Sequence, residues 1–196
     1  MARTQDPLAG LPAVFRWRQA RQAGLHDPRL QQLLAEGAIE RLGHGRYLRT
    51  DVGPVDTDLL ELAVAAPSAT LCLTSALAHH DLTDQIPAQI DVAVPRGQRR
   101  PATRAPVRWH QFAVDTFRLG REEIELVEGV ALGCYTPERT IIDVYRLRHL
   151  EDLQQARDAL RVWLRQPGAQ PADLLALAAH FPNALGQLRT DLEVLL

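Results

Sequence analysis

The stretch GLHDPRLQQLLAEGAIERLGHGRYLR, residues 24–49, decides the fold of the N-terminal part of this chain. Its second half places Gly43-His44-Gly45 between two short arms that carry arginines. Glycine supplies the positive φ values that tight β-hairpins require, so the pattern predicts a hairpin with these three residues at its tip. A hairpin with several arginines close together is either a solvated edge or a surface that contacts an anion.

The residues before the hairpin predict two short helices. Residues 17–23 are compatible with a first helix, which Gly24 can end in the left-handed conformation. Asp27 then fits the N-cap and Pro28 the first position of a second helix. This helix has one apolar face and is expected to stop at Gly37. The face is formed by Leu30, Leu33 and Leu34. Helix, turn, helix and hairpin together predict a winged helix-turn-helix domain over residues 1–52.

In a DNA-binding domain of this type, the N-terminal end of the second helix meets base edges in the major groove. The outward positions there are Arg29, Gln31 and Gln32, and arginine and glutamine pair well with guanine and adenine. The remaining basic positions are expected to contact the DNA backbone or the minor groove: Arg16, Arg18, Arg41, His44, Arg46 and Arg49. The alternative is a winged helix used only for protein contacts, with these arginines solvated.

The distribution of charge favours localised contacts with anions. The chain has 196 residues and a formal net charge of −2, and all 22 basic residues are arginine. Residues 1–50 hold eight arginines against four acids, whereas residues 51–95 hold seven acids and no arginine. Residues 96–121 hold seven arginines against one acid. Two basic segments in a mildly acidic protein indicate anion-binding surfaces rather than a uniformly basic protein.

A second domain is expected over residues 56–196, after a linker over residues 51–56 that contains Gly53 and Pro54. Apolar segments that read as strands alternate there with amphipathic helices, which predicts a mixed α+β domain ending in helices. One helix is expected to start with Thr136 as N-cap and Pro137 as its first residue. Another is expected to be capped by Thr74 or Ser75.

The second basic segment includes a loop over residues 96–106 that is too rich in proline and glycine to form a regular element. It predicts a second anion-binding surface, for DNA phosphates or for an acidic partner protein. The residues of this surface are Arg96, Arg99, Arg100, Arg104 and Arg108.

No active site or cofactor site emerges from the residues. The absence of lysine excludes a P-loop, a Schiff base and the usual lysine of restriction-type nucleases. Asp91 lies at the start of a strand without a second carboxylate two residues later, so a degenerate nuclease is the weaker alternative. His79 and His80 are adjacent and would point about 100° apart on a helix, which disfavours a shared metal ion. We therefore expect a non-enzymatic protein without cofactor or metal.

The remaining features concern the compartment. Cys72 and Cys134 are the two cysteines, a number that suggests buried thiols in a reducing compartment. No run of about 18 apolar residues appears, and residues 1–15 lack the pattern of a secretion signal. These observations predict a cytoplasmic protein that does not bind a membrane.

Several segments, taken together, resemble the AbiEi family of type IV antitoxins. They are the quoted stretch over residues 24–49, ATLCLTSALAHHDL (69–82), IDVAVPRGQRR (90–100), VRWHQF (107–112) and VALGCYTPERTIIDVYRLRH (130–149). The most specific pieces are Gly45-Arg46-Tyr47 at the end of the predicted wing and the TPERT sequence over residues 136–140. Neither motif is catalytic.

The resemblance implies a winged-helix transcriptional regulator with a C-terminal antitoxin domain. Members of this family repress their own operon by binding inverted repeats in the promoter. They counteract a nucleotidyltransferase-like toxin without forming a stable complex with it, and some also use basic residues of the C-terminal domain on DNA. Related sequences occur as stand-alone regulators with no toxin neighbour, which is the alternative reading of this chain.

Overall fold

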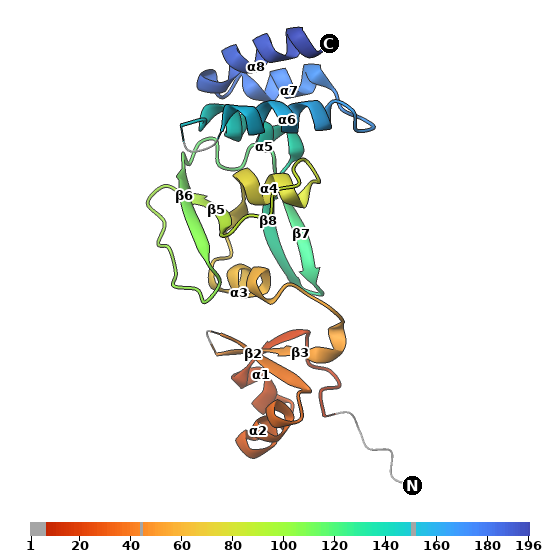
Figure 1. The fold of residues 1–196 in the computed structure, drawn as a ribbon. Coiled ribbons are helices and arrows are strands. Elements are labelled where there is room, and N and C mark those ends of the chain that lie inside the picture. Colours follow the sequence, from red (N-terminus) through yellow and green to blue (C-terminus); the bar gives the residue numbers. More distant parts are fainter. Residues whose placement is uncertain (1–6, 44, 150–151) are drawn as a thin grey trace. The chain divides into compact units, whose positions relative to one another are not determined.

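The structure is a computed structural model that describes residues 7–43, 45–149 and 152–196. The chain divides into two compact units, which are described separately. The first comprises residues 1–67 and 125–132, and the second comprises residues 68–124 and 133–196. Figure 1 shows the elements of both.

The first unit begins with two short helices and a three-stranded antiparallel sheet of order β1-β3-β2. A 3₁₀ turn and a further helix follow the sheet. The elements are β1 (Val14–Arg16), α1 (Trp17–Gln22), α2 (Asp27–Ala35), β2 (Ile39–Gly43), β3 (Arg46–Arg49), η1 (Thr50–Val52) and α3 (Thr57–Ala65).

The local signals at the ends of α1 and α2 are largely confirmed. Gly24 and Gly37 follow the two helices with φ of 84° and 70°, a conformation in which glycine avoids the strain that a Cβ atom causes. The expected N-cap of α2 was wrong by one residue: His26 is the N-cap, and Asp27 is the first helical residue. The reason is that the Asp27 carboxylate accepts a hydrogen bond from the Trp17 indole rather than capping its own helix.

The predicted hairpin is confirmed as β2 and β3, which pair with Ile39 opposite Arg49 and Gly43 opposite Arg46. His44, at the predicted tip, lies outside the described residues. Strand β1 was not predicted. It pairs with the edge of β3 that faces away from β2 and places Phe15 opposite Tyr47. The Phe15 and Tyr47 rings stack with their centroids 5.5 Å apart.

The apolar face of α2 contributes to the core of the first unit. Leu30 and Leu33 are each 2% exposed, whereas Leu34 is only partly buried. Complete burial of a leucine side chain stabilises a fold by roughly 1.5–3 kcal/mol. The leucines therefore hold α2 against a core that also includes Phe15, Ala20, Leu25 and Ile39.

In its described residues, the second unit contains a five-stranded mixed sheet of order β6-β5-β4-β8-β7 and five helices. The tip of the β7–β8 hairpin, residues 125–132, is grouped with the first unit. The strands are β4 (Thr70–Leu71), β5 (Ile90–Pro95), β6 (Val107–Phe112), β7 (Arg121–Val127) and β8 (Val130–Tyr135). The helices are α4 (Leu73–His79), α5 (Pro137–Arg146), α6 (Leu153–Trp163), α7 (Pro171–Ala178) and α8 (Pro182–Leu195).

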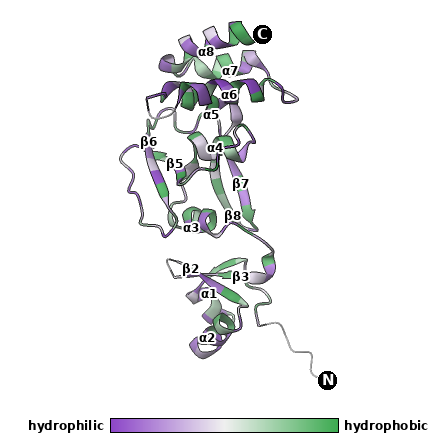
Figure 2. Cartoon of the chain, viewed as in Figure 1, coloured by the Kyte–Doolittle hydropathy of each residue, from purple (hydrophilic) through white to green (hydrophobic). Residues whose placement is uncertain are grey.

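Strands β5 and β6 are adjacent and parallel, with Ile90 opposite Val107 and Pro95 opposite Phe112. Their connection is the basic loop over residues 96–106, which contains no helix or strand. Parallel neighbours are usually joined by a helix that covers the sheet. The hydrophilic loop coloured purple in Figure 2 takes the place of that helix and leaves its side chains largely at the surface.

Helix α5 is the centre of the helical layer and contacts α4, α6, α7 and α8 (Figure 1). Its start is confirmed: Thr136 is the N-cap, its hydroxyl accepts a hydrogen bond from the Arg139 N–H, and Pro137 follows. The expected cap of α4 was wrong, because Cys72 is the N-cap and Thr74 and Ser75 lie in the first turn. The Ser75 hydroxyl instead accepts a hydrogen bond from the Asp91 N–H in strand β5.

The chain is therefore a mixed α+β protein with two sheets and several helices. The predicted boundary between residues 1–52 and 56–196 stays a prediction, while α3 and residues 125–132 group with the first unit. Within the described residues, the apolar helices are all too short to cross a bilayer.

Candidate nucleic-acid interface

Two of the predicted DNA-contacting arginines lie directly opposite each other. Arg16, the last residue of β1, pairs in register with Arg46, the first residue of β3. Among the described residues neither side chain forms an ion pair with a carboxylate. Partial burial lowers the pKa of Arg46, and the charge of Arg16 lowers it further. Like charges facing each other across a sheet are destabilising, and an anion bound between them relieves the repulsion.

Helix α2 presents the predicted base-reading residues at the surface. Gln31 and Gln32 are exposed and Arg29 is half-buried. Glu36, at the end of α2, accepts a hydrogen bond from the Gln32 amide at 2.7 Å and lies 3.9 Å from the Arg29 guanidinium. These contacts are exposed and therefore weak, so both side chains can exchange them for base edges.

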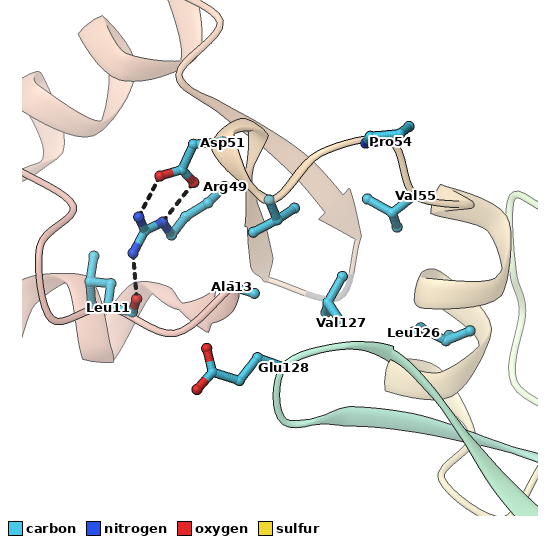
Figure 3. Close-up of a pocket in the computed structure, with 10 residues that line it drawn as sticks. Leu11, Ala13, Arg49, Asp51, Pro54, Val55, Leu126, Val127 and Glu128 are labelled. Atoms are coloured by element: carbon cyan, nitrogen blue, oxygen red, sulfur yellow. Dashed lines mark hydrogen bonds and ion pairs between the residues drawn. The ribbon is translucent and has the colours of Figure 1, made fainter.

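The other predicted backbone contacts divide into two groups. Arg18 on α1 and Arg41 on β2 are exposed. Arg49 instead holds the first unit together: its Nη1 donates to the carbonyl oxygens of Leu8 and Leu11 at 3.1 and 2.8 Å, and its Nε donates to the Asp51 carboxylate at 2.9 Å. Figure 3 shows the Arg49 guanidinium between Asp51 and the Leu11 carbonyl. We therefore leave Arg49 out of the proposed DNA surface.

A cavity of about 370 Å³ lies beside Arg49 in the first unit. Its lining is mixed, with Val55, Leu126 and Val127 on one side and the Arg49–Asp51 pair on the other (Figure 3). The charges of Arg49 and Asp51 already satisfy each other, and the third charged residue of the lining, Glu128, is exposed to solvent, so we propose no ligand for this cavity.

The second predicted surface lies in the second unit. Arg96, Arg99, Arg100 and Arg104 are exposed on the loop between β5 and β6. Arg108 is different, because it lies on β6 opposite Asp91 of β5 and donates from Nη2 to Asp91 Oδ2 at 2.9 Å. Arg108 thus neutralises a buried carboxylate, and we remove it from the proposed anion-binding surface.

Asp91, the residue on which a nuclease would depend, is completely buried. Burial disfavours its ionised form, but hydrogen bonds from His110, at 2.8 Å, and from Arg108 outweigh this, so the pKa of Asp91 is lowered below its usual value. Within the described ranges, no group of three or more His, Cys, Asp or Glu side chains is placed to hold a metal ion. Asp91 is a structural anion paired within the sheet.

The adjacent histidines also have separate surroundings. His79 is largely exposed. The part of its ring that is buried lowers its pKa, and the neighbouring His80 lowers that pKa further. The His80 Nε2 lies 2.7 Å from the carbonyl oxygen of Tyr135 and so ties α4 to the end of β8. Cys72 and Cys134 are both free and buried. His80 and the two thiols are therefore part of the packed structure of this unit, whereas His79 lies at its surface.

Sequence reasoning missed the role of Arg139 in the TPERT sequence. Its side chain is completely buried, with the guanidinium carbon 4.3 Å from the ring centroids of both Tyr135 and Phe181. Arginine is rarely buried unless it is paired. The only signal in the sequence was Asp143 four residues later, a spacing that places a carboxylate on the same helix face.

The sequence profile described as the AbiEi antitoxin C-terminal domain matches residues 69–187 of this chain. The chain belongs to the AbiEi antitoxin family. The match covers α4 to α7, the first part of α8 and the whole five-stranded sheet, and the TPERT residues lie within it. Membership identifies the chain as an antitoxin of a toxin–antitoxin system, and the AbiEi antitoxins are not an enzyme family.

Among solved structures, the AbiEi chain is similar to the RV2827C protein from Mycobacterium tuberculosis. The two share 16% sequence identity with a TM-score of 0.51, over 94% of this chain and 76% of that protein. At this identity the similarity concerns the fold alone. Among curated proteins, no relative matches this chain.

Proposed function

We propose that this AbiEi antitoxin binds double-stranded DNA through a winged helix-turn-helix domain formed by α1, α2 and the β1-β3-β2 sheet. The observation that carries the proposal is the facing pair Arg16 and Arg46, which have no carboxylate partner among the described residues. A phosphate of the DNA backbone has the charge and the size to lie between two guanidinium groups. The wing then lies along the backbone and α2 enters the major groove.

In this arrangement Arg29, Gln31 and Gln32 read base edges, while Arg16, Arg18, Arg41 and Arg46 contact phosphates or the minor groove. His44 completes the predicted wing tip. The expected target is the inverted repeats of the protein's own promoter, so that the antitoxin represses its own operon. The basic balance of residues 1–50 supports this assignment.

The exposed arginines of the loop between β5 and β6 form the proposed second anion-binding surface. The loop lacks the helix that usually joins parallel strands, and Arg96, Arg99, Arg100 and Arg104 are exposed on it. Replacement of all four by glutamine is expected to lower the salt dependence of DNA binding. An unchanged salt dependence would assign this surface to an acidic partner protein.

The test of the central proposal is fluorescence anisotropy with the chain's own upstream DNA and a scrambled duplex, at two salt concentrations. Arg16→Ala and Arg46→Ala should each weaken binding to both duplexes alike, and each should reduce the salt slope by about one unit. Because both arginines contact one phosphate, the double variant should lose less than the sum of the single losses. Arg189→Ala, an exposed arginine on α8, is the matched control.

Unchanged affinity and salt slope in Arg46→Ala would refute the placement of the wing on DNA. Absence of any binding to DNA by the natural chain would leave the first unit as a protein-contact domain.

The second part of the proposal concerns the toxin. We propose that the second unit counteracts a nucleotidyltransferase-like toxin without a stable complex, as the family resemblance implies. Co-expression with the product of the neighbouring reading frame tests this: the natural chain and Arg46→Ala should both restore growth, because Arg46 lies in the other unit. Failure of both to restore growth would favour a stand-alone regulator.

A further inference from the structure

Three side chains gather at the start of α2, on the surface proposed to face DNA. Trp17, the first residue of α1, is 45% exposed, and its indole N–H donates a hydrogen bond of 2.6 Å to Oδ1 of Asp27, the first residue of α2. The Arg21 guanidinium lies over the Trp17 ring, 5.2 Å from its centroid. Trp17 is therefore held from two sides while it remains accessible to solvent.

Asp27 is an unexpected residue at this place, because a carboxylate is repelled by DNA phosphates. It is one of four acidic residues among the first 50, and it is exposed. Its Oδ1 receives the Trp17 hydrogen bond, and no residue in the described part of the chain donates to its Oδ2. The carboxylate is thus oriented by one oxygen and has an acceptor available on the other.

We propose that Asp27 is a specificity-determining residue that accepts a hydrogen bond from the exocyclic amino group of a cytosine, and that Trp17 is the positioning residue that orients it. This proposal rests on the proposed DNA-binding function. A carboxylate accepts but does not donate hydrogen bonds, so it is repelled by the acceptor atoms of guanine and thymine. Cytosine presents only its 4-amino donor in the major groove, whereas the amino donor of adenine lies beside the N7 acceptor, so cytosine is the better match. It complements Arg29, Gln31 and Gln32, which suit guanine and adenine.

The hydrogen bond from Trp17 fixes the orientation of the Asp27 carboxylate. An exposed aspartate ordinarily samples several rotamers. The hydrogen bond from Trp17 holds one rotamer already in the free protein, so less side-chain entropy is lost when DNA binds. Trp17 also joins the first residue of α1 to the first residue of α2, so it fixes how the start of α2 is presented. Loss of this hydrogen bond is expected to affect base preference more than overall affinity.

The experiment measures binding of the full chain to its own upstream duplex in which each C·G pair of a half-site is replaced in turn by T·A. For the natural protein, one replacement should weaken binding by roughly tenfold, as is common for a mismatched base pair. Asp27→Asn keeps an acceptor for Trp17 but is neutral, and it should reduce that penalty to roughly twofold while strengthening binding to scrambled DNA. Trp17→Phe keeps a ring without the donor and should also reduce the penalty.

The matched control is Glu40→Gln, which removes an exposed negative charge from β2 rather than from α2. It should strengthen binding to scrambled DNA as Asp27→Asn does, but it should leave the base preference unchanged. A second measurement avoids variants altogether: 2-pyrimidinone, which lacks the 4-amino group of cytosine, is placed at the sensitive position. The natural protein should lose roughly tenfold in affinity for this duplex.

If the natural protein binds its promoter specifically and Asp27→Asn retains the same base profile, the inference is wrong and the proposed function stands. Retention of the full penalty in Trp17→Phe would overturn the positioning role of Trp17. Absence of sequence-specific binding by the natural protein would overturn the proposed function, and this inference with it.

Discussion

Arg139 and Asp143 form an ion pair inside the second unit, with 3.0 Å between Nε and Oδ1 and both side chains completely buried. The Arg139 Nη1 also donates to the carbonyl oxygens of Thr116 and Leu119, at 2.8 and 2.6 Å. The arginine thus connects α5 to the loop between β6 and β7. Arg139, in the TPERT sequence of the AbiEi domain, therefore has a structural role in the second unit.

Asp143→Asn is expected to destabilise the second unit strongly. The substitution leaves Arg139 as a buried charge without its carboxylate, and breaking such a pair typically costs about 3–5 kcal/mol. Urea unfolding followed by circular dichroism measures the loss. The control is Asp158→Asn, whose pair with Arg161 is exposed and should contribute less than about 1 kcal/mol. Equal losses in the two variants would contradict the structural role of the buried pair.

Gly120→Ala should be far more destabilising than Gly129→Ala. Both glycines have positive φ, 62° and 77°, so alanine strains the backbone at either position. At Gly120 a Cβ atom would also lie 2.6 Å from the Arg139 Cβ, whereas at Gly129 no atom lies within 4 Å. Thermal melts of the two variants separate the two effects, because Gly120→Ala has steric overlap and backbone strain whereas Gly129→Ala has backbone strain alone. Similar melting temperatures would contradict the close packing at Arg139.

Arg49→Ala and Arg46→Ala should separate stability from DNA binding. Arg49 donates to two carbonyl groups and pairs with Asp51, so its loss should lower the free energy of unfolding by about 1–3 kcal/mol. Arg46 faces Arg16, so its loss should leave stability unchanged or slightly increased. Denaturant titrations of both variants provide the measurement, and an Arg49→Ala variant as stable as the natural chain would show that these contacts contribute little.

Acid should destabilise the second unit partly through Asp91. Because the folded-state pKa of Asp91 is below its unfolded value, of about 3.9, its ionised form stabilises the fold above that pH. This contribution disappears as the pH falls below about 4 and through the folded-state pKa. Asp91→Asn should therefore be less stable than the natural chain at pH 7, and its stability should depend less on pH in the acid range. Parallel curves of stability against pH would refute the prediction.

Both thiols should be unreactive in the folded protein. Burial raises the pKa of Cys134 to about 12 and raises the pKa of Cys72 well above its usual range, so neither forms a thiolate at neutral pH. Ellman's reagent should label neither thiol at pH 8 and both after denaturation in urea. Rapid labelling of the native protein would show that one of the two sites opens readily.

Local signals predicted many elements of this chain correctly. Gly24 and Gly37 end their helices, Thr136 and Pro137 start α5, and the hairpin of β2 and β3 lies where the glycines placed it. Each of these features depends on the backbone preference of a few consecutive residues. Where two caps were misplaced, at Asp27 and at Thr74 or Ser75, a contact with a distant residue determined the outcome.

Sequence alone determined that the chain is a mixed α+β protein with two arginine-rich segments, since composition and short-range periodicity are properties of neighbouring residues. Only the tertiary structure decided which arginines have partners. It paired Arg49 with Asp51 and with the backbone of residues 8 and 11, paired Arg108 with the buried Asp91, and placed Arg16 opposite Arg46. Apart from Arg49 and Asp51, which are two residues apart, these pairings join residues that are far apart in the chain through strand order and register, and no local pattern encodes them.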